Sequence, residues 1–212
     1  MLLCTTLSFA LEWHNIMGSS FCNNIESSSY NGADVSGNFG SVGFYVADGL
    51  YPTDSHIGFL ISGQLNVFPN GMLAKTGQPY GLFDSFAWNG KFLLAPAIKN
   101  TGNGYSDTII FQFAPGIILQ SEFEKGKVGT TKNYKSYTYY AFLFGLGCDV
   151  HLIIPSSSKV GFGIGFTFAY CPFYNPNVEV SYGNKSEKFD IDFDSYKRFQ
   201  FGIIIGIGLN RK

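Results

Sequence analysis

The side chains that could carry out acid–base or nucleophilic chemistry are few and scattered along the chain. Its three histidines are His14, His56 and His151, and none of them has a serine and a carboxylate at the spacing of a known catalytic motif. Because a nucleophilic triad is defined by its geometry, a histidine outside any motif is weak evidence for a catalytic site. We therefore expect no catalytic residue and no enzyme activity.

Metal and cofactor sites are not indicated either. The segment DIDFDS, residues 190–195, resembles the start of a calcium-binding loop, but that loop needs glycine at its sixth position and glutamate at its twelfth. This chain has Ser195 and Phe201 there, and a solvated hairpin over residues 178–193 with GN at its tip is the better interpretation. No zinc site is expected, because neither CxxC spacing nor a nearby histidine pair accompanies the cysteines, which are Cys4, Cys22, Cys148 and Cys171. They are interpreted as structural thiols, with a disulfide between Cys22 and Cys171 as the alternative.

The composition is dominated by aromatic and small residues rather than by charged ones. The 212 residues are 17% aromatic and 14% charged, with 26 glycines and a net charge of -1. Charged residues make up about a quarter of a typical soluble protein, so much of this surface must be apolar. No run of Lys or Arg recurs, which excludes the pattern of a nucleic-acid-binding protein. The longest uncharged run, residues 160–178, is interrupted by glycines and Pro172, so no membrane-spanning helix is expected.

Alternation of large apolar residues with small ones is the strongest structural signal. In VGFGIGFTFAYC, residues 160–171, every second residue is large and apolar, and the residues between them are mostly glycine. A soluble strand that buried its large side chains would carry polar residues on its other face. Large residues outside and small residues inside instead fit a narrow barrel in lipid. The side chains expected to face lipid include Phe162, Phe166, Phe168, Phe199, Phe201 and Ile203.

The same alternation recurs along the chain and predicts a single all-β domain over residues 1–212. In addition to 160–171, the clear examples are residues 38–48, 56–68, 107–120, 140–152 and 198–210. Residues 82–96 fit less well, because their NG dipeptide could instead form a tight hairpin. Pro115 indicates a bulge or a weakened ladder. An eighth strand must pass through residues 11–17, because bacterial membrane barrels have an even number of strands.

The first ten residues have two interpretations. Ser8 and Ala10 occupy the small positions before a signal-peptide cleavage site, whereas Leu7, Phe9 and Leu11 continue the alternation of a strand. Residues 1–10 are therefore either a signal-peptide remnant, which we favour, or the start of the first strand.

These strands resemble the small eight-stranded outer-membrane barrels, the OmpA/OmpX/OmpW-like group, over nearly the whole chain. The resemblance implies a closed antiparallel up-and-down transmembrane β-barrel with short periplasmic turns and longer extracellular loops. It also implies the outer membrane of a diderm bacterium and insertion by its outer-membrane machinery. The chain departs from the group by ending in GLNRK rather than in an aromatic residue. The short connections are then residues 50–55, 96–105 and 155–159, and the longer ones are 18–37, 69–79, 122–135 and 175–196.

Four ionisable residues have the parity of the inner face: Glu12, Lys91, Asp149 and His151. A charge inside a narrow barrel is costly unless it is paired, so we expect a hydrogen-bonded cluster near the periplasmic end. This cluster either plugs the lumen or lines a polar gate. The inner face also carries large apolar residues, which are Leu60, Leu93, Leu143 and Ile204. A narrow apolar route through the lumen is therefore an alternative interpretation.

Three functions follow from this pattern. The first is a non-enzymatic, monomeric anchor in membrane lipid whose outer loops contact an extracellular partner, because binding often lies in long loops on a rigid scaffold. The second is a narrow channel for small hydrophobic molecules. The third is a soluble lipocalin-like carrier, which would need the large aromatic face inside the barrel.

Overall fold

The computed structural model describes residues 11–30, 33–68, 86–101, 109–130, 133–156, 159–182, 185–190 and 195–211. The segment with two interpretations, residues 1–10, lies outside these ranges, and so does the predicted connection 69–79. Within the described ranges, no helix is long and apolar enough to cross a membrane.

Eight strands close into a ring, and a ninth short strand extends it. The strands are β1 (Leu11–Tyr30), β2 (Ala33–Pro52), β3 (Ile57–Phe68), β4 (Phe86–Thr101), β5 (Ile110–Thr130), β6 (Asn133–Pro155), β7 (Val160–Tyr182), β8 (Lys185–Asp190) and β9 (Ser195–Arg211). Consecutive strands pair antiparallel from β1 to β7, and β9 closes the ring between β7 and β1. The predicted closed up-and-down barrel of eight strands is confirmed.

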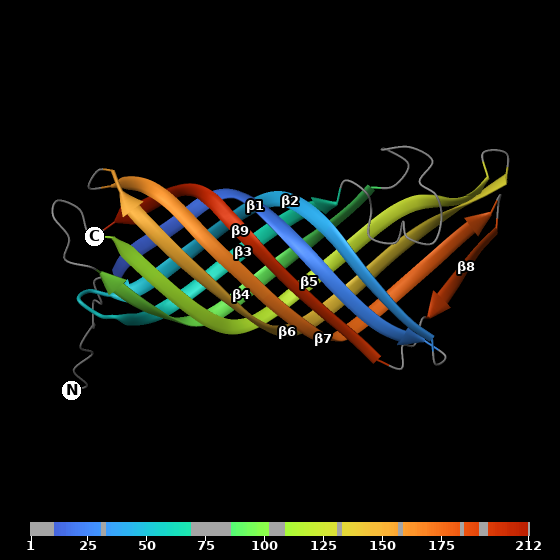
Figure 1. The fold of residues 1–212 in the computed structure, drawn as a ribbon, viewed down its shortest axis with the longest axis horizontal. Helices are drawn as coiled ribbons and strands as arrows, with labels where there is room; N and C mark the ends of the chain where they lie inside the picture. The colour runs from blue at the N-terminus through green and yellow to red at the C-terminus, as the bar shows by residue number, and fades with distance from the viewer. Residues whose placement is uncertain are drawn as a thin grey trace, which may run out of the picture.

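The strands run diagonally around a long barrel (Figure 1). Because Trp13 pairs with Arg211, β1 begins at the same end at which β9 finishes. We call this end the terminal end, and we call the opposite end, which carries the β1–β2, β5–β6 and β7–β8 hairpins, the far end.

At the far end the strands are longer than the sequence pattern indicated. β1 continues to Tyr30 and β6 begins at Asn133, so most of the predicted connections 18–37 and 122–135 is strand. These segments are rich in Ser, Asn, Thr and Lys, so the hydropathy alternation stops although the backbone ladder continues. β7 and β8 form the predicted hairpin, since Tyr182 pairs with Lys185, and the GN dipeptide predicted at its tip lies outside the described residues.

β4 is one continuous strand through its NG dipeptide. Asn89 pairs with Asn66 of β3 and Glu122 of β5, so this dipeptide forms no hairpin. Pairing on both sides holds the backbone extended there.

A bulge in β7 changes which residues face inward. The pairing steps from Leu146↔Tyr170 to Phe144↔Phe173, which leaves one extra residue on β7 next to Pro172. Proline has no N–H for the ladder, and bulges are where strands tolerate it. Beyond the bulge Phe173 faces outward, with 63% of its surface exposed.

Two further prolines interrupt the backbone pairing between β4 and β5. Residues 95–97 of β4 and 114–116 of β5 form no pairs with each other, and the ladder resumes in the same register at Ile98↔Phe113. Pro96 and Pro115 occupy opposite positions in this gap, so neither strand provides a backbone donor there. The weakened ladder expected at Pro115 is therefore present, without a bulge. The buried side chains behind the gap are small, and they are Ala95, Ala97 and Ala114.

The outer face of the barrel carries the large apolar side chains. The six residues named above as lipid-facing all lie on this face with 39–55% of their surface exposed; they are Phe162, Phe166, Phe168, Phe199, Phe201 and Ile203. We call the ring of exposed large apolar side chains around the wall the apolar belt.

Glycines on the inner face make room for large buried side chains. Gly206 of β9 pairs with Gly163 of β7 on one side and with Gly18 of β1 on the other. A Cβ atom added to Gly163 would lie 2.6 Å from Cδ1 of Ile16, which is fully buried. Gly163 therefore leaves the space that Ile16 fills, whereas Gly18 and Gly206 let the backbones of β1 and β9 approach each other.

Replacing Phe166 with arginine is expected to lower the free energy of unfolding in lipid bilayers by about 2–4 kcal/mol, because the charge would enter hydrocarbon near the middle of the belt. Urea titration with heat-modifiable gel mobility as the readout measures this change. Ser27→Arg, on the outer face beyond the belt, is the control and should change stability by less than about 0.5 kcal/mol. An unchanged midpoint for Phe166→Arg would contradict its lipid-facing assignment.

Replacing Gly163 with alanine is expected to cost about 1–3 kcal/mol, because the new methyl group overpacks the lumen against Ile16. Ile16→Val removes the crowded Cδ1 atom but keeps Cγ1, which is 2.8 Å from the added Cβ, so the double variant should recover part of the loss in the same titration. Equal instability of the single and double variants would place the crowding elsewhere.

Candidate functional site

Polar and charged side chains fill the barrel at three levels. The terminal cluster consists of Glu12, His14, Tyr51 and Lys99. The central cluster consists of Tyr45, Ser62, Lys91, Gln112, Asp149, His151 and Thr167. The far-end cluster consists of Asn24, Glu122, Tyr139, Tyr174, Tyr196 and Arg198. Apart from Tyr174, which is partly buried, all of these residues are buried.

Asp149 is the centre of the central cluster. Its Oδ2 atom accepts hydrogen bonds from the hydroxyls of Tyr45 and Ser62, both at 2.5 Å, and its Oδ1 atom accepts one from Thr167 at 2.7 Å. Lys91 Nζ in turn donates to Thr167 Oγ1 at 2.5 Å. The carboxylate and the ammonium group therefore face each other through one hydroxyl group.

His151 extends this cluster through its two ring nitrogens. Nε2 lies 2.7 Å from the hydroxyl oxygen of Tyr45, and Nδ1 lies 3.2 Å from Oε1 of Gln112. Which of these two contacts His151 donates depends on the tautomer of its ring.

The central cluster does not have the order of contacts that nucleophilic catalysis requires. A nucleophilic hydroxyl must contact its base, but Ser62 donates to Asp149, and the partners of His151 are Tyr45 and Gln112. Ser62, Asp149 and His151 are at most 1% exposed. The chemistry of this site is charge pairing inside the barrel.

The structure brings together three of the four ionisable residues singled out from the sequence. Lys91, Asp149 and His151 share the central cluster, whereas Glu12 belongs to the terminal cluster. The inner-face parity predicts a single cluster of the four ionisable residues near the periplasmic end, and this prediction is wrong for Lys91. Lys91 lies in the middle of the exposed apolar run of β4, Phe86–Ile98. Strand parity assigns a face of the sheet and does not assign a height in the barrel.

Glu12 pairs with Lys99, which is not among the four ionisable residues predicted to form the cluster. Lys99 Nζ lies 2.5 Å from Glu12 Oε2, and His14 Nε2 lies 3.5 Å from the same oxygen. The Lys99 ammonium also lies 5.0 Å from the centre of the Tyr51 ring. This terminal cluster occupies the lumen where the barrel begins.

An ion pair crosses the lumen in the far-end cluster. Arg198 of β9 donates from Nη1 to Oε1 of Glu122 on β5, and its Nη2 lies 3.3 Å from Asn24 Oδ1. Tyr139 donates to the other oxygen of Glu122 at 3.1 Å. The guanidinium group lies 4.9 Å from the centre of the Phe39 ring, so it is enclosed on all of these sides.

Tyrosines fill the rest of the far end. The hydroxyls of Tyr139 and Tyr174 are 2.8 Å apart, and the rings of Tyr174 and Tyr196 stack with centres 3.9 Å apart. Tyr137 donates to Glu124 at 2.7 Å. Burial, together with this hydrogen bond, raises the pKa of the Tyr137 hydroxyl well above its ordinary value, so it stays protonated and remains a donor.

The three cysteines among the described residues, Cys22, Cys148 and Cys171, are free thiols, and Cys4 lies outside these residues. Cys22 and Cys171 are buried and unlinked, so the alternative of a disulfide between them is wrong. Cys22 pairs with Gly202 and Cys171 with Arg198, which places β9 between the two thiols. In the part of the chain that the structure describes, no group of three metal-ligating side chains is placed to hold an ion.

Several residues of these clusters were not predicted to take part in one, although their positions in the strands already assigned them to the inner face. Tyr45 and Thr167 are on the inner face of predicted strands, and Lys99 and Arg198 keep the inner parity of β4 and β9. Their role depends on a partner across the lumen, and strand alternation does not name that partner.

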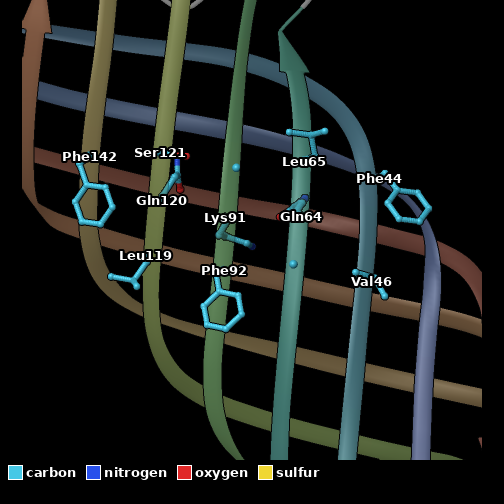
Figure 2. A pocket seen from close by; sticks show the side chains of 12 residues that line it. Phe44, Val46, Gln64, Leu65, Lys91, Phe92, Leu119, Gln120, Ser121 and Phe142 are labelled. Carbon is cyan, nitrogen blue, oxygen red and sulfur yellow. The ribbon is translucent and has the colours of Figure 1, made fainter.

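A hollow of about 440 Å³ lies on the outside of the wall (Figure 2). Its floor consists of Gly63, Gly90 and Ser121, and larger outward side chains such as Phe92 and Phe142 surround it. It opens on the outer face within the apolar belt, and Lys91 of the central cluster is also among its lining residues.

The fold has close counterparts among solved structures, although no family model matches the chain and no curated protein matches it. The outer membrane protein OprG from Pseudomonas aeruginosa is similar at a TM-score of 0.55 and 11% identity, over 96% of this chain and 97% of that one. Neisserial surface protein A is similar at a TM-score of 0.50 and 10% identity, over 96% and 99%. This chain has the fold of the small outer-membrane β-barrels. The three clusters are therefore the contents of the lumen in a barrel of this fold.

Replacing Lys91 with alanine is expected to destabilise the barrel by about 3–5 kcal/mol, because it leaves the Asp149 carboxylate buried without a cation. Urea unfolding in detergent micelles measures this loss. Adding Asp149→Asn should recover part of it by removing the unpaired charge. Lys197→Ala, which removes an exposed cation, is the control. If Lys91→Ala destabilised the barrel no more than Lys197→Ala does, the buried pair of Lys91 and Asp149 would contribute little to stability.

Proposed function

We propose that the chain is an integral outer-membrane protein of a diderm bacterium that acts as a non-enzymatic, monomeric anchor. The terminal end is its periplasmic end, and the far end is extracellular. In this proposal the outer-membrane insertion machinery assembles the barrel, and the hairpins of the far end contact an extracellular partner.

The observation that supports this proposal most is the set of contacts that cross the lumen. Tyr45 reaches from β2 to Asp149 on β6, and Lys91 reaches from β4 to Thr167 on β7. Eight strands leave an interior just wide enough for side chains to fill, and these side chains occupy it. A filled barrel has the rigidity of a scaffold and lacks a water-filled path.

The far end supports the presentation of a surface. A strand crosses the membrane with about 9–11 residues, whereas β6 and β7 each have 23, so they continue well beyond the apolar belt. The side chains of residues 185–188 of β8 are exposed. A partner would therefore meet hydrogen-bonded hairpins on a fixed base.

Planar-bilayer recordings of the purified protein are expected to show no stable ion conductance. Heat-modifiable gel mobility of the same sample verifies that the barrel is folded, so a silent bilayer reports closure rather than misfolding. Reproducible conductance steps from the folded, unmutated protein would contradict a closed anchor.

A narrow route for small hydrophobic molecules is the second candidate, and the gap between β4 and β5 favours it. Pro96 and Pro115 remove two backbone donors from the wall, and only small side chains lie behind them. If this gap is a route, Pro115→Val should restore a donor and slow the uptake of a small aromatic solute into proteoliposomes. Equal uptake by the variant, the unmutated protein and protein-free liposomes would contradict the route.

A soluble carrier is not supported. It would bury the large aromatic face inside, whereas Phe162 and Phe201 of this barrel are each 47% exposed on its outer face.

A further inference from the structure

A carboxylate lies on the outer wall inside the apolar belt. Asp48 of β2 pairs with Asn15 of β1, and both half-buried side chains have the parity of the outer face. The exposed apolar residues around them are Trp13, Met17, Val46 and Ile61. Among the described residues, neither Asp48 nor Asn15 has a side-chain hydrogen bond or an ion pair. An ionisable group without a partner is costly in hydrocarbon, so this one indicates a contact that the barrel alone does not provide.

Trp13 marks the depth of this polar pair. It is the outward residue next to Asn15 on the side of the terminal end, and 42% of its surface is exposed. Tryptophan is favoured at the interface between lipid tails and headgroups. Asp48 lies beyond Trp13 toward the far end, which places its carboxylate on the hydrocarbon side of that interface.

Small residues continue from Asp48 along the barrel axis. The pairing row of Asp48 climbs the barrel, since it begins at Val160, the first residue of β7, and reaches Leu146 in the middle of β6. With strands tilted by about 35–45°, the position above an outward residue is two residues farther along and one strand across. That position is Gly63 above Asp48, and Gly90 above Gly63. The column therefore runs along the membrane normal.

This column crosses the floor of the hollow in the outer wall. Gly63 and Gly90 both line the hollow. Their neighbours in the same pairing rows line it too, and they are Val46 and Leu65 on one flank and Phe92 and Ser121 on the other (Figure 2). We call the column of Asp48, Gly63 and Gly90, together with Asn15, the wall groove.

We propose that a second copy of this chain packs against the wall groove in the plane of the membrane. A two-fold axis along the membrane normal brings each residue to a residue of similar height on the other side of the axis. The Asn15 amide of one copy then donates to Asp48 of the second copy, and the reverse contact forms as well. Each carboxylate therefore gains an amide donor, and no carboxylate faces another.

The rest of the wall groove fits the same axis. Its two glycines lie on the axis, and small residues at a contact within the membrane let two backbones approach closely. The flanks are unlike, and the axis places each flank against the other. Val46 faces Phe92 of the second copy, and Leu65 faces Ser121 of the second copy. The side chains beside the glycines therefore interdigitate.

The inference rests on the proposed membrane location and goes beyond the proposed function. Each barrel is a closed ring that needs no partner to fold, so one inserted monomer is a complete anchor. The pair forms between two such anchors after insertion, where lipid surrounds Asp48.

Disulfide crosslinking in liposomes tests the position of the contact. A Cβ atom at Gly63 would approach only Val46 Cγ1, at 3.8 Å, so Gly63→Cys should fold normally and place its thiol on the axis. With an oxidant, we expect several-fold more covalent dimer than from the unmutated protein, which controls for the native cysteines. Phe166→Cys, in the belt on the opposite side of the ring, is the matched control and should add no dimer. A yield from Gly63→Cys no higher than from Phe166→Cys would overturn the wall groove as the contact.

Exchanging the amide and the carboxylate tests the polar contact. Energy transfer between dye-labelled copies in liposomes, measured at increasing lipid dilution, reports the pairing. We expect Asn15→Asp to weaken pairing about tenfold, equivalent to about 1.4 kcal/mol, because carboxylates then face each other. Asn15→Asp/Asp48→Asn restores one amide and one carboxylate at each contact and should recover the pairing. A double variant that pairs as weakly as Asn15→Asp would overturn the polar contact.

Heat-modifiable mobility of the same liposome samples separates this inference from the proposed function. Folded, inserted protein that shows no pairing at any lipid dilution would overturn the second copy as the occupant of the wall groove, and would leave the anchor intact. Protein that is folded but does not insert would contradict the membrane location itself.

Discussion

The closure of the sheet by pairing of β1 with β9 is the constraint on which the rest of the structure depends. This ladder runs from Trp13↔Arg211 to Ser29↔Ser195 without an interruption. In hydrocarbon each unpaired backbone group costs several kcal/mol, so a sheet can cross a membrane only as a ring. Eight strands then set the diameter, and the diameter decides which side chains the interior can hold. The glycine row at Gly18, Gly163 and Gly206 and the large residues on the outer face are consequences of that size.

The narrow lumen also requires each buried charge to have a partner of opposite charge. Each level of the lumen pairs a cation with a carboxylate: Lys99 with Glu12, Lys91 with Asp149 through Thr167, and Arg198 with Glu122. A single buried charge would be very costly, whereas a pair with satisfied hydrogen bonds is tolerated. Because partners come from different strands, each pair also joins two walls of the barrel. The same contacts therefore both neutralise the interior and connect its walls.

The prolines show where the wall departs from a regular ladder. Pro172 accompanies a bulge that turns β7, and it brings Tyr174 inward to meet Tyr139 and Tyr196. Pro96 and Pro115 face each other and remove pairing between β4 and β5 without a change of register. One defect builds the far-end cluster, and the other interrupts the backbone pairing between β4 and β5.

Alternation by itself determined the strands of the belt, their inner and outer faces and the residues that need an internal charge partner. Side-chain direction in a strand depends only on local parity, so Phe166 and Asp149 could be assigned to opposite faces. The extensions of β1, β5, β6 and β7 were missed because polar residues carry no hydropathy alternation. Only the tertiary structure decided that Glu12 binds Lys99 and that Asp149 faces Lys91. Those pairings depend on the tilt and register with which eight strands close, and that is a property of the whole ring, whereas alternation is a property of each strand.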